Sequence, residues 1–244
     1  MHRAILLDLD DTLLGNPMET FLPAYFRMLQ EYLQELIAPE RLMEELMRAT
    51  EAMNAYREEP CTNEEAFAAV FYSGVGLERA QVEPVFERFY AEVFPELKRF
   101  TVRRPAARNL VEWAFDEELQ VAVATNPLFP RDPVEQRLAW AGVPVDEFDY
   151  DLITTYETMH ATKSHVAYYQ EILGRLGREP EDCLMVGDNL AMDVLPASSL
   201  GIHTYWVTEE NATPSSDMTL AGQGTLAELW QGVASRDALP TAVS

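Results

Sequence analysis

Positive charge is scarce in this sequence, which has 18 Lys and Arg residues against 41 Asp and Glu residues and a formal net charge of -23. A field of that sign repels nucleic acid and anionic membranes, so we expect neither as a partner. No apolar run approaches the ~20 residues of a membrane span, and no basic segment precedes a long apolar stretch as in a signal peptide. We therefore expect a soluble, cytoplasmic protein whose partner is a small molecule.

Cysteine is nearly absent as well. Cys61 and Cys183 are too few for a disulfide framework, and the apolar run around Cys183 predicts that this thiol is simply buried. Apolar residues make up 48% of the 244 positions, so a substantial core can form. The length fits one large α/β domain, or a core domain with a smaller insertion.

The most informative segment is an apolar run that ends in carboxylates. Residues 5–7 (Ile-Leu-Leu) show no polar alternation, as expected of a central strand in a parallel sheet that is covered on both faces. Asp8 and Asp10 follow where ligands bind in such sheets, and side chains two residues apart point the same way. Two close carboxylates need a cation or a shared proton, and Mg2+ would relieve their repulsion. The alternative is that these acids only cap the next helix.

Residues 17–100 are helical in pattern. Apolar residues recur at three- and four-residue spacings through 22–36 and 42–53, and two further helices are predicted at 63–72 and 81–93. Gly74 and Gly76 follow no strand and have no third glycine, so we interpret them as a helix-to-helix turn rather than a nucleotide loop. Candidates to face a ligand from this segment are Tyr25, Arg27, Tyr56, Arg57, Phe71 and Tyr72.

From about residue 101 helices and apolar strands alternate. We predict strands at 120–126, 151–155, 183–186 and 203–207, helices at 105–115, 132–141, 164–176, 189–200 and 226–233, and a loop at 209–219. The pattern predicts an α/β fold with a Rossmann-like parallel sheet. We assign residues 1–16 and 101–244 to this catalytic core and residues 17–100 to an inserted helical domain.

Three strands thus end in polar side chains that suit phosphoryl transfer. Asp8 is the expected nucleophile, which would form an aspartyl-phosphate, and Asp10 the general acid and base. Thr125 offers a hydroxyl to the phosphate, and Lys163 supplies a point charge for both Asp8 and the phosphate. Asp188 with Asp8 suits a partly hydrated Mg2+.

Together these residues strongly resemble the haloacid dehalogenase-like hydrolase superfamily. Asp8 to Thr12 is similar to its first motif, DxDxT, and Thr125 and Lys163 resemble its second and third. The run 187–193 (Gly-Asp-Asn-Leu-Ala-Met-Asp) is similar to the fourth motif, GDxxxxD. The helical insert resembles the C1 cap of the family's phosphatase branch.

The resemblance implies more specific roles. Asp8, the backbone carbonyl of Asp10 and Asp188 would hold Mg2+. Asn126 would bind the phosphate through its backbone N–H. Asp193 would be an acid in the outer shell of the metal, or would only orient the start of a helix. Asp11 would cap its turn.

We therefore expect a Mg2+-dependent phosphomonoester hydrolase acting on a small phosphorylated metabolite. A phosphomutase of the β-phosphoglucomutase type, or a non-catalytic binding module that keeps the fold, are alternatives. Under the resemblance to this superfamily, the presence of Asp10 counts against a dehalogenase. The absence of lysine from residues 1–97 counts against phosphonate cleavage. Many relatives have proline after the lysine of the third motif, whereas Ser164 follows Lys163 here. His160 and His165 flank that lysine. Either could contact the substrate, but we favour a solvent-exposed or packed role for both.

Overall fold

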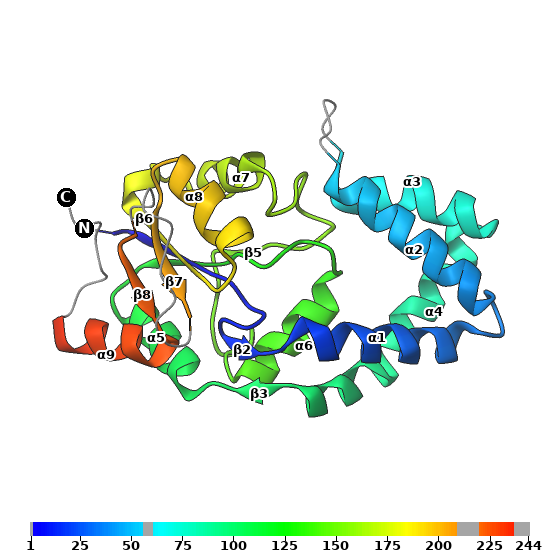
Figure 1. The fold of residues 1–244 in the computed structure, drawn as a ribbon, viewed down its shortest axis with the longest axis horizontal. Helices are drawn as coiled ribbons and strands as arrows, with labels where there is room; N and C mark the ends of the chain where they lie inside the picture. Colours follow the sequence, from blue (N-terminus) through cyan, green and yellow to red (C-terminus); the bar gives the residue numbers. More distant parts are fainter. Residues whose placement is uncertain (1, 56–60, 209–219, 237–244) are drawn as a thin grey trace.

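The computed structural model describes residues 2–55, 61–208 and 220–236 of the chain. Its centre is a parallel sheet of six strands in the order β5-β4-β1-β6-β7-β8 (Figure 1). The strands are β1 (Ala4–Leu7), β4 (Gln120–Val123), β5 (Leu152–Ile153), β6 (Cys183–Gly187), β7 (His203–Val207) and β8 (Gly222–Gly224). Strand β1 lies between β4 and β6, where the chain order switches direction, and ligands bind at such points in open α/β sheets.

Helices cover both faces of the sheet, as the unbroken apolar strands require. Alternate side chains of β1 lie on opposite faces of the sheet. Ile5 and Leu7 belong to one apolar cluster, and Ala4 and Leu6 belong to the other. The first cluster is completed by α5 (Pro105–Asp116), α6 (Arg131–Ala141) and α9 (Leu226–Arg236). The second is completed by α7 (Val166–Leu176) and α8 (Leu195–Ser199).

A helical cap is inserted after the first strand and extends to one side of the sheet (Figure 1). It comprises α1 (Met18–Leu33), α2 (Pro39–Asn54), α3 (Asn63–Val75), α4 (Arg79–Glu92) and the 3-10 helix η1 (Phe94–Phe100). The short strands β2 (Leu14–Gly15) and β3 (Val102–Arg103) pair antiparallel where the chain enters and leaves the cap. The predicted boundaries at residues 17 and 100 lie beside this pair, and the division into two domains stays a prediction.

The predicted α/β fold with a Rossmann-like sheet and a helical cap is confirmed. Gly76 ends α3 at φ 73°, a left-handed conformation that suits glycine, so the turn between α3 and α4 begins there. Gly74, which was also expected in this turn, still lies within α3. The sequence analysis missed β2, β3 and β8, each of which is only two or three residues long. The expected strand at 151–155 is shorter, since β5 contains only Leu152 and Ile153.

The expected loop at 209–219 and the candidates Tyr56 and Arg57 lie outside the described residues. Within the described ranges, no helix combines the length and the apolar character needed to cross a bilayer.

Candidate active site

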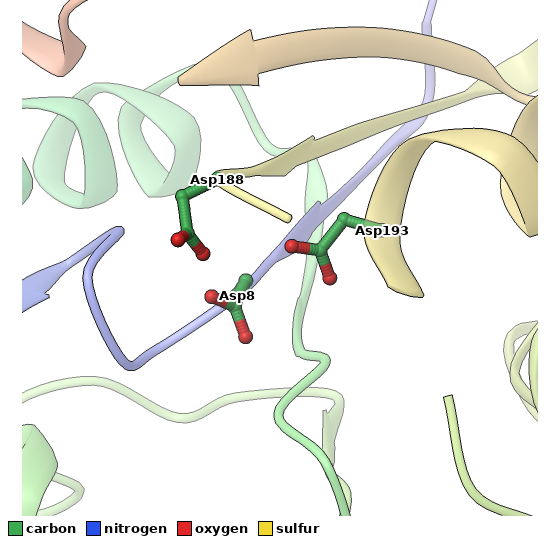
Figure 2. A group of neighbouring side chains, drawn as sticks. All are labelled: Asp8, Asp188 and Asp193. Atoms are coloured by element: carbon green, nitrogen blue, oxygen red, sulfur yellow. The ribbon is translucent and has the colours of Figure 1, made fainter. Parts of the chain in front are cut away.

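Three carboxylates converge at the carboxyl ends of β1 and β6. Asp8 directly follows β1, Asp188 directly follows β6, and Asp193 lies in the turn that leaves β6 (Figure 2). One carboxylate oxygen of each lies within 4.8 Å of the other two. The structure therefore brings Asp8 and Asp188 together, as the strand pattern predicted, and adds Asp193 to the same cluster.

Lys163 joins two of these carboxylates. Its Nζ lies 2.5 Å from Asp8 Oδ1 and 2.5 Å from Asp193 Oδ1, and its side chain is 3% exposed. Burial alone would lower the pKa of Lys163, but the adjacent Asp193 and Asp8 raise it well above its usual value. The ammonium is thus held charged between two elements that are far apart in the sequence.

The cluster carries more negative than positive charge. The three carboxylates contribute -3 and Lys163 contributes +1, which leaves a formal charge of -2 in a largely buried site. Burial raises the pKa of Asp8, and Asp193 and Asp188 add to this effect while Lys163 opposes it. Burial also raises the pKa of Asp188 to about 6, helped by Asp193 and Asp11. Hard oxygen donors with this excess charge fit a divalent cation such as Mg2+.

The backbone around β6 leaves room for Asp193. A Cβ atom at Gly187 would lie 2.4 Å from the Asp193 carboxyl carbon, so only glycine fits at this position. Asp193 Oδ2 accepts a hydrogen bond of 2.9 Å from the Asn189 backbone N–H, and the Asn189 side chain caps the following turn. That turn, Leu190–Val194, is a π-helix, a rare geometry that is frequent at functional sites. Asp193 thus both contacts Lys163 and orients the start of the turn.

The end of β4 contributes the predicted phosphate-binding segment. Thr125 is buried, and its carbonyl accepts hydrogen bonds from Thr154 Oγ1 at 2.7 Å and from Tyr168 Oη at 2.9 Å. The Asn126 side chain accepts a bond of 3.3 Å from the Lys163 backbone N–H. These contacts fix the loop after β4 against the segment that carries Lys163. Thr12, the last residue of the first motif, donates a 2.9 Å hydrogen bond to Asp8 Oδ2.

Asp10 has partners that the sequence analysis did not identify. Its Oδ2 lies 2.5 Å from Arg137 Nη1, and its Oδ1 accepts a 2.7 Å bond from the Asn16 side chain. The Arg137 side chain is 1% exposed, and its guanidinium lies 4.7 Å from the centre of the Phe129 ring. A signal did exist, because Arg137 lies between Val134 and Leu138 on the apolar face of a predicted helix, where an arginine is rare unless it is paired.

The remaining polar neighbours have structural contacts. Asp11 adopts a left-handed conformation (φ 58°), and its Oδ1 accepts a 2.8 Å bond from the Asn16 backbone N–H, which closes the turn. His160 contacts Glu171 at 2.9 Å, and His165 donates a 2.7 Å bond to the carbonyl of Asn54 in the cap.

The cap is bound to the core beside the loop after β4. Asn63, the first residue of α3, donates a side-chain bond of 3.1 Å to the Pro127 carbonyl and a backbone bond to the Met159 carbonyl. Among the expected ligand-facing cap residues, Tyr25 and Tyr72 line a cavity between cap and core. Phe71 is buried and Arg27 is exposed.

The family model for haloacid dehalogenase-like hydrolases matches residues 2–201. The chain belongs to this family. Comparison with curated proteins found no match. Among solved structures, the chain is similar to a HAD phosphatase from Thermococcus onnurineus, with 22% identity, a TM-score of 0.59 and 100% of both chains covered.

Two further structures show the same fold as this haloacid dehalogenase-like hydrolase. A 2-haloacid dehalogenase from Pseudomonas syringae has 19% identity and a TM-score of 0.66, over 98% of this chain and 100% of the other. CbbY from Rhodobacter sphaeroides, solved in complex with phosphate, has 20% identity and a TM-score of 0.54, over 94% and 96% of the two chains. The suspected family resemblance is confirmed, and these likenesses establish the fold.

The contact between Arg137 and Asp10 predicts an effect on stability. Replacing Arg137 by Met removes the positively charged partner of the Asp10 carboxylate and leaves only Asn16 bonded to it, so we expect the free energy of unfolding to fall by about 3 kcal/mol in urea titrations. Arg131→Met is the matched control, since Arg131 lies on the same helix with a side chain that is 63% exposed. It should change stability by less than about 0.5 kcal/mol. Equal effects of the two substitutions would contradict the structural role of Arg137.

The raised pKa of Asp188 predicts a pH-dependent effect in the Mg2+-free protein. Because this pKa moves from 3.8 to about 6 on folding, ionising Asp188 destabilises the fold progressively as pH rises from about 4 to above 6. Asp188→Asn removes that ionisation, so the variant should be more stable than wild type at pH 8 by on the order of 2 kcal/mol. The difference should shrink toward zero near pH 4. If the variant is less stable than wild type at pH 8, the ionised Asp188 carboxylate does not destabilise the fold.

Proposed function

We propose that this hydrolase cleaves the phosphate monoester of a small metabolite through an aspartyl-phosphate on Asp8. The observation that carries this proposal is the environment of Asp8, whose two carboxylate oxygens are held separately by Lys163 and Thr12. A carboxylate fixed in this way at a strand end can attack phosphorus without rotating. The phosphate found in the CbbY structure, at 20% identity, is compatible with an anionic substrate.

In the first step a carboxylate oxygen of Asp8 bonds to phosphorus and the ester P–O bond breaks. The alcohol leaves with a proton that Asp10 donates. In the second step a water molecule attacks the phosphorus of the acyl phosphate, Asp10 takes its proton, and inorganic phosphate and free Asp8 are released. Both oxygens of Asp10 are hydrogen-bonded in this structure, so Asp10 must exchange one partner, Asn16 or Arg137, to reach the substrate.

Lys163 and the loop after β4 bind the transferred group in this proposal. The Lys163 ammonium contacts the nucleophile, and its charge also offsets the charge that develops on the phosphoryl oxygens. Thr125 and the backbone N–H of Asn126 would donate hydrogen bonds to these oxygens. Asp193 keeps Lys163 in place through its own contact.

Asp8, Asp188 and the backbone carbonyl of Asp10 would hold Mg2+, with Asp193 beside them. When bound, Mg2+ supplies the positive charge that offsets both the carboxylate cluster and the phosphate. Dehalogenation and phosphomutase activity remain rival chemistries within this fold. Carbon–halogen cleavage gives no role to the acid at position 10, whereas phosphate ester cleavage uses it for both proton transfers. The third rival, a non-catalytic binding module, is disfavoured because Asp8 and Asp10 are both present.

The roles of the two aspartates can be separated by labelling. With Mg2+ and a phosphate ester of a good leaving group, Asp10→Asn should still form acyl phosphate and then stall, because no base activates water. Asp8→Asn should form none. Acid-quenched samples, followed over milliseconds to seconds, measure the labelled protein, and omission of Mg2+ should abolish labelling. Equal labelling of both variants, or labelling at another residue, would overturn the mechanism.

Lys163→Ala tests the contribution of the buried ammonium. Removing a charge that contacts the nucleophile should lower kcat/KM by 100-fold or more, which corresponds to about 3 kcal/mol. The control is Lys98→Ala, which removes the chain's other lysine from an exposed position in η1. That variant should keep wild-type activity. A loss of less than about tenfold for Lys163→Ala would show that this lysine does not stabilise the transition state.

A further inference from the structure

A large cavity lies between the cap and the core. Its volume is about 680 Å³, within the range of small-molecule sites, and helices α1 to α4 form one side of it. The other side is formed by core residues 128–132, 156 and 157. The mechanism proposed above uses none of these residues, so the cavity is available for the part of the substrate that does not react.

The cavity is formed in part by the same loop that carries the proposed phosphate-binding residues. Its core wall begins at Leu128, two residues after Asn126, which limits the distance between their Cα atoms to about 7 Å. Phe129 lines the cavity and also lies against the Arg137 guanidinium, which in turn contacts Asp10. An ester whose phosphate lies at Asp8 can therefore place its alcohol part in this cavity.

The walls of the cavity are rich in aromatic rings. Tyr25 and Phe26 come from α1, Phe67 and Phe86 from α3 and α4, and Phe129 and Tyr156 from the core. Ring contacts join several of these residues, including Tyr25 with Phe129 and Phe67 with Tyr156. Such walls suit a flat apolar group better than a polyol, whose hydroxyl groups would lose hydrogen bonds to water.

The charged groups that line the cavity are mostly acidic. Arg131 is the cation among the described lining residues, and Glu135, outside the cavity, already pairs with it. Glu64 and Glu83 share Arg79. Glu157 also lines the cavity, and its Oε1 accepts a 2.9 Å hydrogen bond from the Arg131 backbone N–H.

The combination of aromatic walls with mostly acidic lining residues favours a neutral group or a cation over an anion. Cations are attracted to ring faces, and the surplus of carboxylates among the lining residues attracts them further. A second anionic group on the substrate would instead face carboxylates without a free cation among the described lining residues. These charges select against phosphorylated acids and bisphosphates.

We infer that the cavity binds the alcohol part of the substrate, and that this part is an aromatic group of neutral or, preferably, positive charge. The inference rests on the proposed phosphatase activity and specifies its substrate class. It concerns binding, so selectivity should appear mainly in KM and kcat/KM.

A matched series of esters tests this inference on the wild-type enzyme with Mg2+. The series is 2-phenylethyl phosphate with hydrogen, aminomethyl or carboxylate at the para position, which leaves the reacting alcohol nearly unchanged. We expect kcat/KM to be equal or higher for the aminomethyl ester than for the parent ester, and at least tenfold lower for the carboxylate ester. Glycerol 3-phosphate should also be at least tenfold poorer than the parent. A carboxylate ester or glycerol 3-phosphate as good as the parent would overturn the inference.

Glu157→Gln tests whether the Glu157 carboxylate contributes to the preference for the aminomethyl ester over the carboxylate ester. It should reduce the ratio of kcat/KM for the aminomethyl ester over the carboxylate ester by fivefold or more. Glu96→Gln is the control, since Glu96 is an exposed carboxylate of η1 that does not line the cavity and should leave the ratio unchanged. Equal ratios in wild type and Glu157→Gln would remove Glu157 from the inference.

Acetyl phosphate separates this inference from the proposed function, because its small acyl group does not need the cavity. If the wild type cleaves acetyl phosphate but does not discriminate within the series, only the cavity inference fails. If it cleaves neither acetyl phosphate nor the esters, the proposed function itself fails.

Discussion

The excess of negative charge around Lys163 is the constraint on which the site depends. One buried ammonium does not neutralise three nearby carboxylates. Burial, together with the repulsion between these carboxylates, raises the pKa values of Asp8 and Asp188. In the function proposed here, the same imbalance lets the cluster bind a divalent cation, and with it phosphate. Under that proposal, the stability of the metal-free protein and the activity of the metal-bound protein depend on the same arrangement of charges.

The sheet and the cap make that arrangement possible. Because β1 lies between β4 and β6, their carboxyl ends bring Asp8, Thr125 and Asp188 to one edge. Lys163 reaches this edge from the segment before α7, which the Asn126 side chain contacts. The loop after β4 also forms a wall of the cavity under the cap. A single loop therefore connects the proposed phosphate site to the surface that would select the alcohol.

The sequence was sufficient to predict what depends on local pattern. Apolar runs that end in Asp8, Thr125 and Asp188 predicted three neighbouring strand ends, and the spacing of apolar residues predicted the cap helices. Strands β2, β3 and β8 were missed because two or three residues carry no periodic signal, and their pairing is set by tertiary contacts. The partners of Asp10 were missed for a related reason: Arg137 lies 127 residues away, and only the folded chain brings it to the first motif. The cavity, likewise, is formed by segments from both domains.

The central claim is that Asp8 and Asp188 hold a divalent cation beside Lys163. Crystals grown with Mn2+ in place of Mg2+, measured for the anomalous scattering of manganese, test this claim most directly. The account predicts one strong peak about 2.2 Å from carboxylate oxygens of both Asp8 and Asp188, with Lys163 still in contact with Asp8. A peak located elsewhere, or no peak at saturating Mn2+, would contradict it.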